Sequence, residues 1–389
     1  MSRADLAECA NRWLAANTGG SGALDAHALA RYERGAVVRP NRDYRAALRA
    51  VLGATRDSEL GFDRAETTPS ARSAPSLTPL HAPLEHTGQF TDAPADSDTV
   101  NELRTTIHHL VALDGNLGGG EVAPLALRAF RRTQRILDQG DYRASVERDL
   151  EATAAELAEV AGWCLIDAGR FTEAHRVNVA ALRLAAIAGD TSMEWFVLSN
   201  DALVSLYQGN PYAALRIARR FGEANLPNRV RALFEIRQAR ALAALESPTA
   251  LDIFDKARSE LTESFTHRDP PWTWWVDQRE LAVQRGHVRN GLGHSQDALR
   301  DMLESWELSR EKEHLRWATY ITAANALRLS LRVGAWQEAE RITAEILPMV
   351  GEVSSGRTEN ILRGTVAEIP RNISSTLVGS LEQIRAELD

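Results

Sequence analysis

The chain has 389 residues, of which 44% are hydrophobic, and its formal net charge is -8 at pH 7. A chain of this length exceeds one ordinary core, so we expect at least two folding units or one elongated repeat array. It contains no apolar run of the roughly 18 residues that a membrane helix needs and no signal segment, which favours a cytoplasmic protein. The negative net charge argues against a protein that coats nucleic acid.

Residue patterns typical of enzymes and metal sites are missing from the sequence. Cys9 and Cys164 lie in no CxxC or Cys/His cluster, so we expect buried or partly buried thiols. The glycines of LGGGE, from Leu117, follow no predicted strand and precede no lysine, and there is no HExxH or GxSxG motif. We therefore predict a protein that is not an enzyme and that binds no cofactor and no metal.

The first 64 residues contain two segments with the pattern of helices. SRADLAECANRWL has a capping-box start, with Ser2 as the N-cap and Asp5 three residues later. LDAHALARYERG, from Leu24 to Gly35, ends on a glycine suited to a C-terminal cap. The stretch from Arg31 to Arg49 holds six arginines against two acidic residues, so any contact with nucleic acid should lie there.

LDAHALARYERG resembles the recognition-helix segment of helix-turn-helix regulators of the xenobiotic-response-element class, and SRADLAECANRWL resembles the helix before it. The resemblance implies that Leu24, Leu29 and Tyr32 face the core of a small domain, as do Leu48, Val51 and Leu52 of the next helix. It also implies a set of residues that face DNA, some toward base edges and some toward phosphates. These are Asp25, Ala26, His27, Arg31, Arg34, Arg39, Arg42, Tyr44 and Arg45.

The segment departs from that family in two respects. The family's first helix would lie before Ser2 and is missing here, so we expect that either the true start lies further upstream or the domain is degenerate. The usual tight turn is also replaced by a longer stretch, Ala15 to Ala23. An alternative remains open, in which the segment is a small helical cap and YERG is an ordinary helix end.

Residues 65–98 hold five of the chain's fourteen prolines amid serine and threonine. Such a stretch cannot bury enough apolar surface to offset the entropy lost on ordering. We therefore predict a flexible linker between a DNA-binding segment, residues 1–64, and a second domain, residues 99–389.

The second domain carries an internal repeat. AGRFTEA, QGNPYAA, LGHSQDA and VGAWQEA each place a glycine five residues before an alanine: Gly169 and Ala174, Gly209 and Ala214, Gly293 and Ala298, Gly334 and Ala339. A degenerate copy places Glu246 and Leu251 in these roles. The residues seven positions before the five turns are mostly small: Gly162, Ala202, Ala239, Gly286 and Leu327.

This spacing predicts a helix, a turn and a second helix, because small residues let two helices pack closely and the glycine ends the first one. We therefore expect an all-α chain with a tetratricopeptide-like solenoid of about five helical pairs. Helices from Val100 to Gly140 would cap one end, and Ile361 to Asp389 the other.

The first helices of such pairs line a concave groove. The residues expected there are Glu159, Trp163, Asp167, Tyr207, Arg240, Glu280, His287, Asn290 and Arg328. Aromatic groups with both signs of charge suit a peptide or protein segment better than a small apolar metabolite. Trp163 can equally be a core residue.

The segment PPWTWWVDQRE, from Pro270 to Glu280, holds three tryptophans in four residues. They cannot all face the same way, so at least one should lie on a surface. Trp272 and Trp275 are candidate contacts for an effector or a second copy. The alternative is packing under the linker or a cap.

The order of these parts, with LDGNLGGGEVAPL, ELAEVAGWCLIDAGRFTEAHR, PPWTWWVDQREL and SGRTENIL, is similar to actinobacterial regulators that join a helix-turn-helix domain to a C-terminal tetratricopeptide-like domain. The resemblance implies a transcriptional regulator whose repeat domain dimerises and binds a peptide, protein or small-molecule effector. Its partners would be operator DNA, that effector and a second copy of the chain. The alternative function is a protein–protein interaction adaptor with a vestigial DNA-binding domain.

Overall fold

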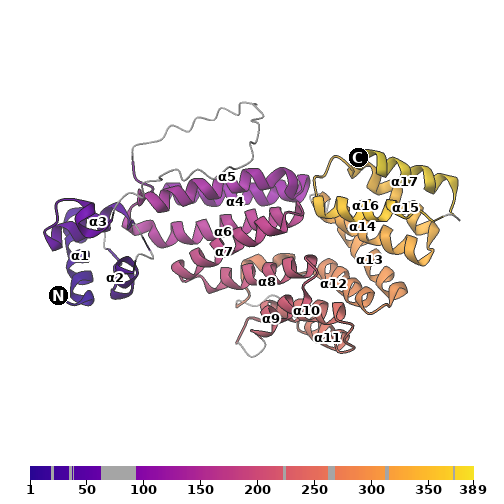
Figure 1. Cartoon of the computed structure of the whole chain (residues 1–389), viewed down its shortest axis with the longest axis horizontal. Helices are drawn as coiled ribbons and strands as arrows, with labels where there is room; N and C mark the ends of the chain where they lie inside the picture. The colour runs from indigo at the N-terminus through magenta and orange to yellow at the C-terminus, as the bar shows by residue number, and fades with distance from the viewer. Residues whose placement is uncertain are drawn as a thin grey trace, which may run out of the picture. The chain divides into compact units, whose positions relative to one another are not determined.

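The computed structural model describes residues 1–18, 22–34, 37, 39–62, 93–221, 225–261, 268–311, 315–370 and 373–389. These residues form 17 α-helices and four short 3-10 helices, with one isolated β-bridge between Ala95 and Tyr142 (Figure 1). The predicted all-α class is confirmed. The chain divides into two compact units: unit 1 comprises residues 1–102 and 132–150, and unit 2 comprises residues 103–131 and 151–389.

Unit 1 begins with α1 (Arg3–Thr18), α2 (Ala26–Glu33), α3 (Arg42–Leu52) and the 3-10 helix η1 (Asp57–Leu60). The capping box expected at the start of α1 is present. The Ser2 backbone N–H donates to the Asp5 carboxylate (3.0 Å), and the Asp5 N–H donates to the Ser2 hydroxyl (3.2 Å). The expected cap at Gly35 lies outside the described residues, as does most of the predicted linker.

One apolar core joins the three helices of unit 1. Leu24, Leu29, Tyr32 and Leu48 are buried in it, as predicted. Leu52 is 47% exposed, because it is the last residue of α3 and lies beyond the core. The prediction that Leu52 is a core residue was therefore wrong.

Unit 1 also includes residues that the sequence had assigned to the linker and the repeats. Ala95 pairs with residues 141–143, where its N–H donates to the Asp141 carbonyl and its carbonyl accepts from the Arg143 N–H (both 2.9 Å). The 3-10 helix η2 (Ala144–Val146) follows in the same segment, and Ala144 packs against the core of α1, α2 and α3.

The remaining helices form consecutive pairs. They are α4 (Ser97–Leu117) and α5 (Gly119–Gln139), α6 (Glu147–Asp167) and α7 (Phe171–Ala188), α8 (Thr191–Tyr207) and α9 (Pro211–Arg219), α10 (Asn228–Ala244) and α11 (Ala250–Leu261), α12 (Gln278–Gly291) and α13 (Ser295–Arg310), α14 (Arg316–Val333) and α15 (Trp336–Ile346), and finally α16 (Gly356–Ala367) and α17 (Ser375–Leu388). The 3-10 helices η3 (Pro271–Trp275) and η4 (Leu347–Met349) precede α12 and follow α15. The start of α4, the end of α5 and the start of α6 belong to unit 1.

The turns of these pairs have the geometry that the repeat predicts. The four repeat glycines, Gly169, Gly209, Gly293 and Gly334, have φ between 71° and 82°, a region that favours glycine. In the degenerate copy Glu246 takes this role with φ 55°, and it is the one non-glycine residue with positive φ in the described part of the chain. The buried alanine of that copy is Ala250, four residues after Glu246, and the predicted Leu251 is only half-buried.

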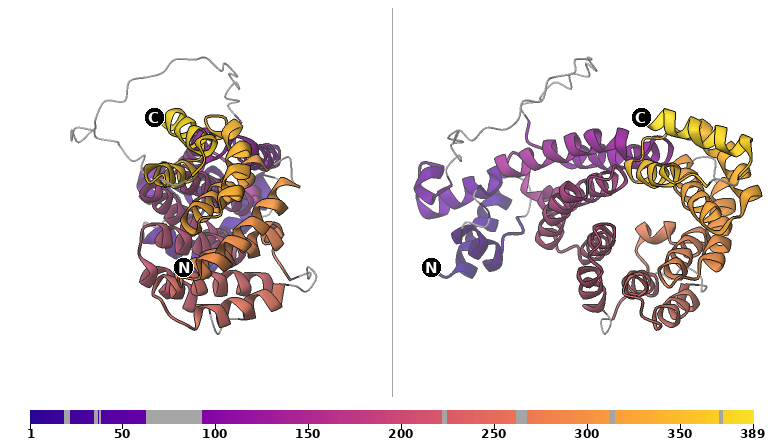
Figure 2. Two further views of the ribbon diagram at one scale, coloured as in Figure 1. Left: turned by 90° about the vertical axis from the view of Figure 1, so that its right-hand side faces the viewer. Right: turned by 45° about the vertical axis from the view of Figure 1, so that its right-hand side comes forward.

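The two ends of unit 2 meet (Figure 2). The Ser354 N–H donates to the Leu117 carbonyl, and the Gly120 N–H donates to the Ser354 carbonyl (both 2.8 Å). A Cβ atom on Gly356 would lie 2.4 Å from the Ala168 carbonyl oxygen, so a glycine is needed where α16 begins. The helices predicted to cap one end of the array, α4 and α5, therefore contact the segment that leads into α16.

Candidate functional site

The N-terminus of α2 is the first candidate for contact with DNA. Asp25 caps the helix, since its carboxylate accepts from the Ala28 N–H (2.6 Å). Ala26 and His27, in the first turn, are exposed, as is Arg34 after the last turn. Glu33 forms an ion pair with Arg3 of α1 (2.6 Å), which fixes α2 on α1. The first turn of α2 is therefore exposed, while Leu29 and Tyr32 of the same helix pack in the core of unit 1.

Arg31 is less accessible than the resemblance implies. It is half-buried, and its Nε atom is enclosed by protein. Its charge acts on Glu147, whose pKa is raised by burial and partly lowered again by Arg31. The half-buried Arg31 therefore has less surface available for a base edge than the resemblance implies.

Arginines gather beside the start of α3. An open cavity of about 390 Å³ is lined by Arg39, Arg42, Arg45 and Arg49, together with Asp57, Gln139 and Asp141. Arg42 is exposed and Arg39 is half-buried. Four guanidinium groups against two carboxylates make this a basic surface suited to phosphate.

Two of the residues predicted to contact phosphate have internal roles instead. Tyr44 is 1% exposed, its hydroxyl accepts from the Ala23 N–H (3.1 Å), and burial raises its pKa to about 12. Arg45 is 7% exposed, donates to the Pro40 carbonyl (3.0 Å) and pairs with Asp57 (3.0 Å). Because both side chains are packed inside unit 1, the structure does not support them as phosphate contacts.

Three buried carboxylates lie near one another in unit 2, from Asp114 of α4 and from Glu159 and Asp167 of α6. Burial, with the nearby charge of Asp167, raises the pKa of Asp114 to about 7. Burial, with the charge of Glu156, raises the pKa of Glu159 to about 8. Asn200 donates to Glu159 (2.8 Å) and the Gly119 N–H donates to Asp167 (2.9 Å). These two predicted groove residues therefore connect helices inside the protein.

Arg357, at the start of α16, reaches residues of α6 and α8. Its Nη1 atom donates to the Tyr207 hydroxyl (2.9 Å), and its Nη2 atom lies 3.4 Å from the Asp167 carboxylate. The guanidinium carbon lies 5.5 Å from the ring centre of Trp163 and 5.6 Å from that of Trp317. Trp163 is half-buried and its Nε1 atom donates to Asp114 of α4 (3.1 Å). Trp163 therefore contacts both α4 and the Arg357 guanidinium of α16.

Four predicted groove residues, each half-buried, come together from different helices: Tyr207 of α8, Arg240 of α10, His287 of α12 and Arg328 of α14. The Arg240 guanidinium carbon lies 5.6 Å from the Tyr207 ring centre. Burial first, and then the charges of Arg240 and Arg328, lower the pKa of His287. With Arg237 of α10, these residues are called the inner face of unit 2. Asn290 is not part of it, since it accepts from the exposed Arg332 (3.3 Å).

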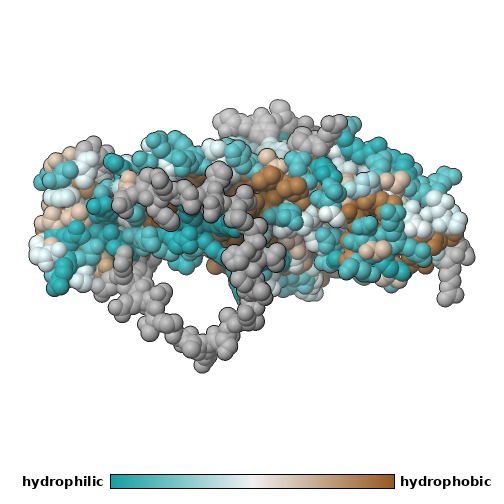
Figure 3. Space-filling view, turned by 90° about the horizontal axis from the view of Figure 1, so that it is seen from above, coloured by the Kyte–Doolittle hydropathy of each residue, from teal (hydrophilic) through white to brown (hydrophobic). Residues whose placement is uncertain are grey.

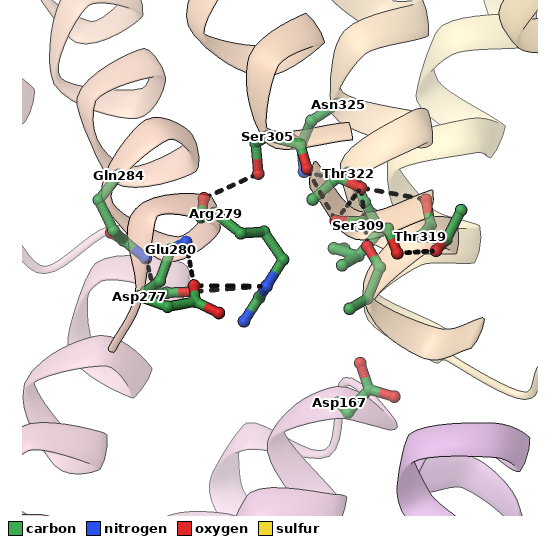
Figure 4. Close-up of polar contacts among 12 residues, drawn as sticks. Asp167, Asp277, Arg279, Glu280, Gln284, Ser305, Ser309, Thr319, Thr322 and Asn325 are labelled. Carbon is green, nitrogen blue, oxygen red and sulfur yellow. Dashed lines mark hydrogen bonds and ion pairs between the residues drawn. The ribbon is translucent and has the colours of Figure 1, made fainter. Parts of the chain in front are cut away.

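Glu280 stands at the start of α12, where Asp277 caps the helix by accepting from the Glu280 N–H (2.9 Å). The Glu280 carboxylate accepts from Gln284 (2.6 Å) and lies 3.7 Å from the Arg279 guanidinium. Figure 4 shows these contacts, with Asp167 of α6 on the opposite side. The charge of Glu280 is therefore already shared with groups of its own helix.

The tryptophan segment forms η3 and packs mainly inside unit 2. Trp272 stacks on Phe196 of α8, with ring centres 4.4 Å apart, and its Nε1 atom donates to Ser192 (2.9 Å). Trp275 also stacks on Phe196, at 6.3 Å. The surface tryptophan is Trp274, which is 52% exposed. Trp272 and Trp275 therefore pack inside unit 2, but against α8 rather than under the linker or a cap as the alternative had it.

No protein-family model matches the chain, and no curated protein matches it. None of the helices in the described ranges is both long enough and apolar enough to cross a membrane.

Sequence reasoning missed Asp114, Arg237, Trp317 and Arg357. Arg237 could have been found, because it lies three residues before Arg240 and so shares its helix face. The other three carry no such signal, because their partners come from distant parts of the chain.

Proposed function

We propose that the chain is a DNA-binding transcriptional regulator, in which unit 1 contacts duplex DNA and unit 2 binds an effector and contributes to dimerisation. The observation that carries the proposal is the combination, within unit 1, of an exposed helix N-terminus on α2 and a cavity lined by four arginines beside α3. A regulator needs both kinds of surface, one for base edges and one for phosphates.

His27 and Arg34 supply the exposed polar side chains of α2, and Ala26 offers a small apolar contact. Imidazole and guanidinium groups can donate to base edges in the major groove. Arg39 and Arg42 would contact phosphate, with Arg42 also placed in the first turn of α3, where the helix dipole favours an anion.

Arg45 and Arg49 would act indirectly. Both pair with Asp57 of η1, so they hold the wall of the cavity rather than the phosphate. Among the arginines that line the cavity, Arg39 and Arg42 form no ion pair with a described residue, so DNA could neutralise them without breaking one.

Unit 2 carries exposed apolar residues that could contact a second copy of the chain. Val111, Leu113, Leu117 and Leu125 of α4 and α5 are each between 38% and 42% exposed. Figure 3 shows a brown, hydrophobic area on the face seen from above. An effector could change DNA binding only if it has different affinities for two arrangements of such a dimer.

Selection from a randomised duplex pool tests the proposal. The chain should retain a preferred sequence, His27→Ala should change that preference, and Arg42→Gln should weaken binding to all sequences and reduce the salt dependence by about one unit of slope. Arg12→Gln, at an exposed arginine of α1, is the matched control and should behave like the parent chain. A folded chain that retains no preferred sequence would contradict the proposal and favour the adaptor.

A further inference from the structure

Three arginines of the inner face have no carboxylate partner in the part of the chain that the structure describes. Their guanidinium groups donate to neutral acceptors instead: Arg237 to the Ser199 carbonyl (3.3 Å), Arg240 to the Gln284 side chain (3.2 Å), and Arg328 to the Asn325 side chain (3.0 Å). Two other half-buried arginines of unit 2 do have a carboxylate partner. Arg285 and Arg289 share Asp301 (2.8 and 2.9 Å).

Cations of the inner face gather around Tyr207. The guanidinium carbons of Arg240 and Arg357 lie 5.6 and 5.1 Å from its ring centre, and Arg237 lies one helical turn before Arg240 on α10. His287 responds to the charges of Arg240, Arg328, Arg357 and Arg237, which lower its pKa in addition to burial. Three of these arginines also act on Tyr207. Burial raises the pKa of Tyr207, but the charges of Arg357, Arg240 and Arg237 lower it by more, so that the pKa is lowered overall. These groups therefore surround one region of the inner face, although they come from α8, α10, α12, α14 and α16.

One of the three arginines has an unused donor. Arg237 is 1% exposed, and its Nη1 atom is buried without a hydrogen-bond partner among the described residues. Burial lowers its pKa to about 10, because the charged guanidinium has lost its water. A buried donor on a buried cation is costly unless a partner binds it.

The charges of this region do not balance. Arg357 is matched by Asp167, at 3.4 Å. The carboxylate that acts on Arg237 is Glu280, which also lies 3.7 Å from Arg279. Three guanidinium groups against this one shared carboxylate leave a surplus of two positive charges.

We propose that the inner face of unit 2 binds a small dianion, either a phosphate monoester or a dicarboxylate, between Arg237, Arg240 and Arg328. Guanidinium groups bind both kinds of oxygen pair in a bidentate manner. The Tyr207 ring centre lies 5.6 Å from the Arg240 guanidinium carbon, and the Tyr207 hydroxyl and the His287 ring, both half-buried, can complete the hydrogen bonds. The inference specifies the effector class and so rests on the effector role in the proposed function.

Calorimetric titration of the full chain with inorganic phosphate and with succinate tests this site. Ionic strength is held constant, and chloride serves as the reference anion. At least one of the two dianions should bind in preference to chloride. Binding of phosphate alone would identify a phosphate monoester site, and binding of succinate alone a dicarboxylate site.

Variants then locate the binding. The double variant Arg240→Gln/Arg328→Gln removes both surplus charges and should weaken dianion binding about tenfold or more. Arg216→Gln, at an exposed arginine of α9, should leave it unchanged. Circular dichroism checks that each variant is folded, and the single Arg328→Gln replaces the double variant if that does not fold.

Two results would overturn the inference: neither dianion binds in preference to chloride, or the inner-face variant binds as well as the Arg216→Gln control. The titration contains no DNA. A failure here therefore leaves the DNA-binding proposal standing, and a failure to select DNA leaves the dianion site standing.

Discussion

Replacing Glu159 by glutamine should make the stability of unit 2 less dependent on pH. Glu159 is 4% exposed, and burial followed by the charge of Glu156 raises its pKa from 4.5 to about 8. The unfolded chain loses this proton near pH 4.5, so between about pH 5 and 8 the folded chain holds one proton more. The stability contributed by the protonated group is therefore fully present below about pH 4.5 and is lost as the pH rises toward 8.

The size of the effect follows from the same shift. One proton changes the free energy of unfolding by about 1.4 kcal/mol per pH unit, which gives about 4 kcal/mol over roughly three units. Asp114, whose pKa is raised from 3.8 to about 7, also makes the folded chain less stable as the pH rises, in this case toward pH 7. Glutamine keeps an oxygen that can accept from Asn200 and cannot ionise, so Glu159→Gln should match the parent chain at about pH 5 and exceed its stability at about pH 8.

Urea unfolding followed by circular dichroism at several pH values measures this difference. Glu121→Gln, at an exposed glutamate of α5, is the control and should follow the parent chain. Parallel stability curves for Glu159→Gln and the parent chain would refute the reasoning, because they would mean that the Glu159 carboxyl is already ionised in the folded protein.

Three further substitutions test the packing. Glu246→Gly should stabilise the chain by about 1 kcal/mol in urea unfolding, because glycine accepts the positive φ of 55° without strain, and no gain would count against that strain. Gly209→Ala, at φ 71° with no atom within 4 Å of a new Cβ, should cost about 1 kcal/mol for the opposite reason, and an unchanged midpoint would be the contrary result. Gly356→Ala would place its Cβ 2.4 Å from the Ala168 carbonyl oxygen and should cost about 1 to 3 kcal/mol, with faster amide exchange in α16; unchanged exchange would argue against the junction of the two ends.

The helical pairs could be predicted because their signals are local. A glycine at each turn and a small residue on each helix lie within about two helical turns of one another, so the repeat is visible in a single sequence. Even the degenerate turn at Glu246 was placed correctly. The capping box of Ser2 and Asp5 was predictable for the same reason.

The closure of unit 2 could not be predicted, because its contacts join residues far apart in the chain. Ser355 donates to Asp167 across 188 positions (2.7 Å). Arg45 is similar in unit 1: it donates to the Gln139 carbonyl, 94 positions away (3.2 Å), whereas the resemblance to helix-turn-helix regulators implied a phosphate contact. Burial of a charged residue depends on such distant partners, so sequence pattern assigned Arg45, Glu159 and Asp167 to surfaces that they do not occupy.

The most direct test of the regulator proposal is binding of the chain to sheared genomic DNA at about 100 and 300 mM salt with unlabelled competitor, followed by sequencing of the retained fragments. The proposal predicts enrichment of one shared sequence that persists at the higher salt concentration, with weaker retention for Arg42→Gln. Retention that shows no shared sequence, or none at all from a chain that circular dichroism shows to be folded, would contradict it.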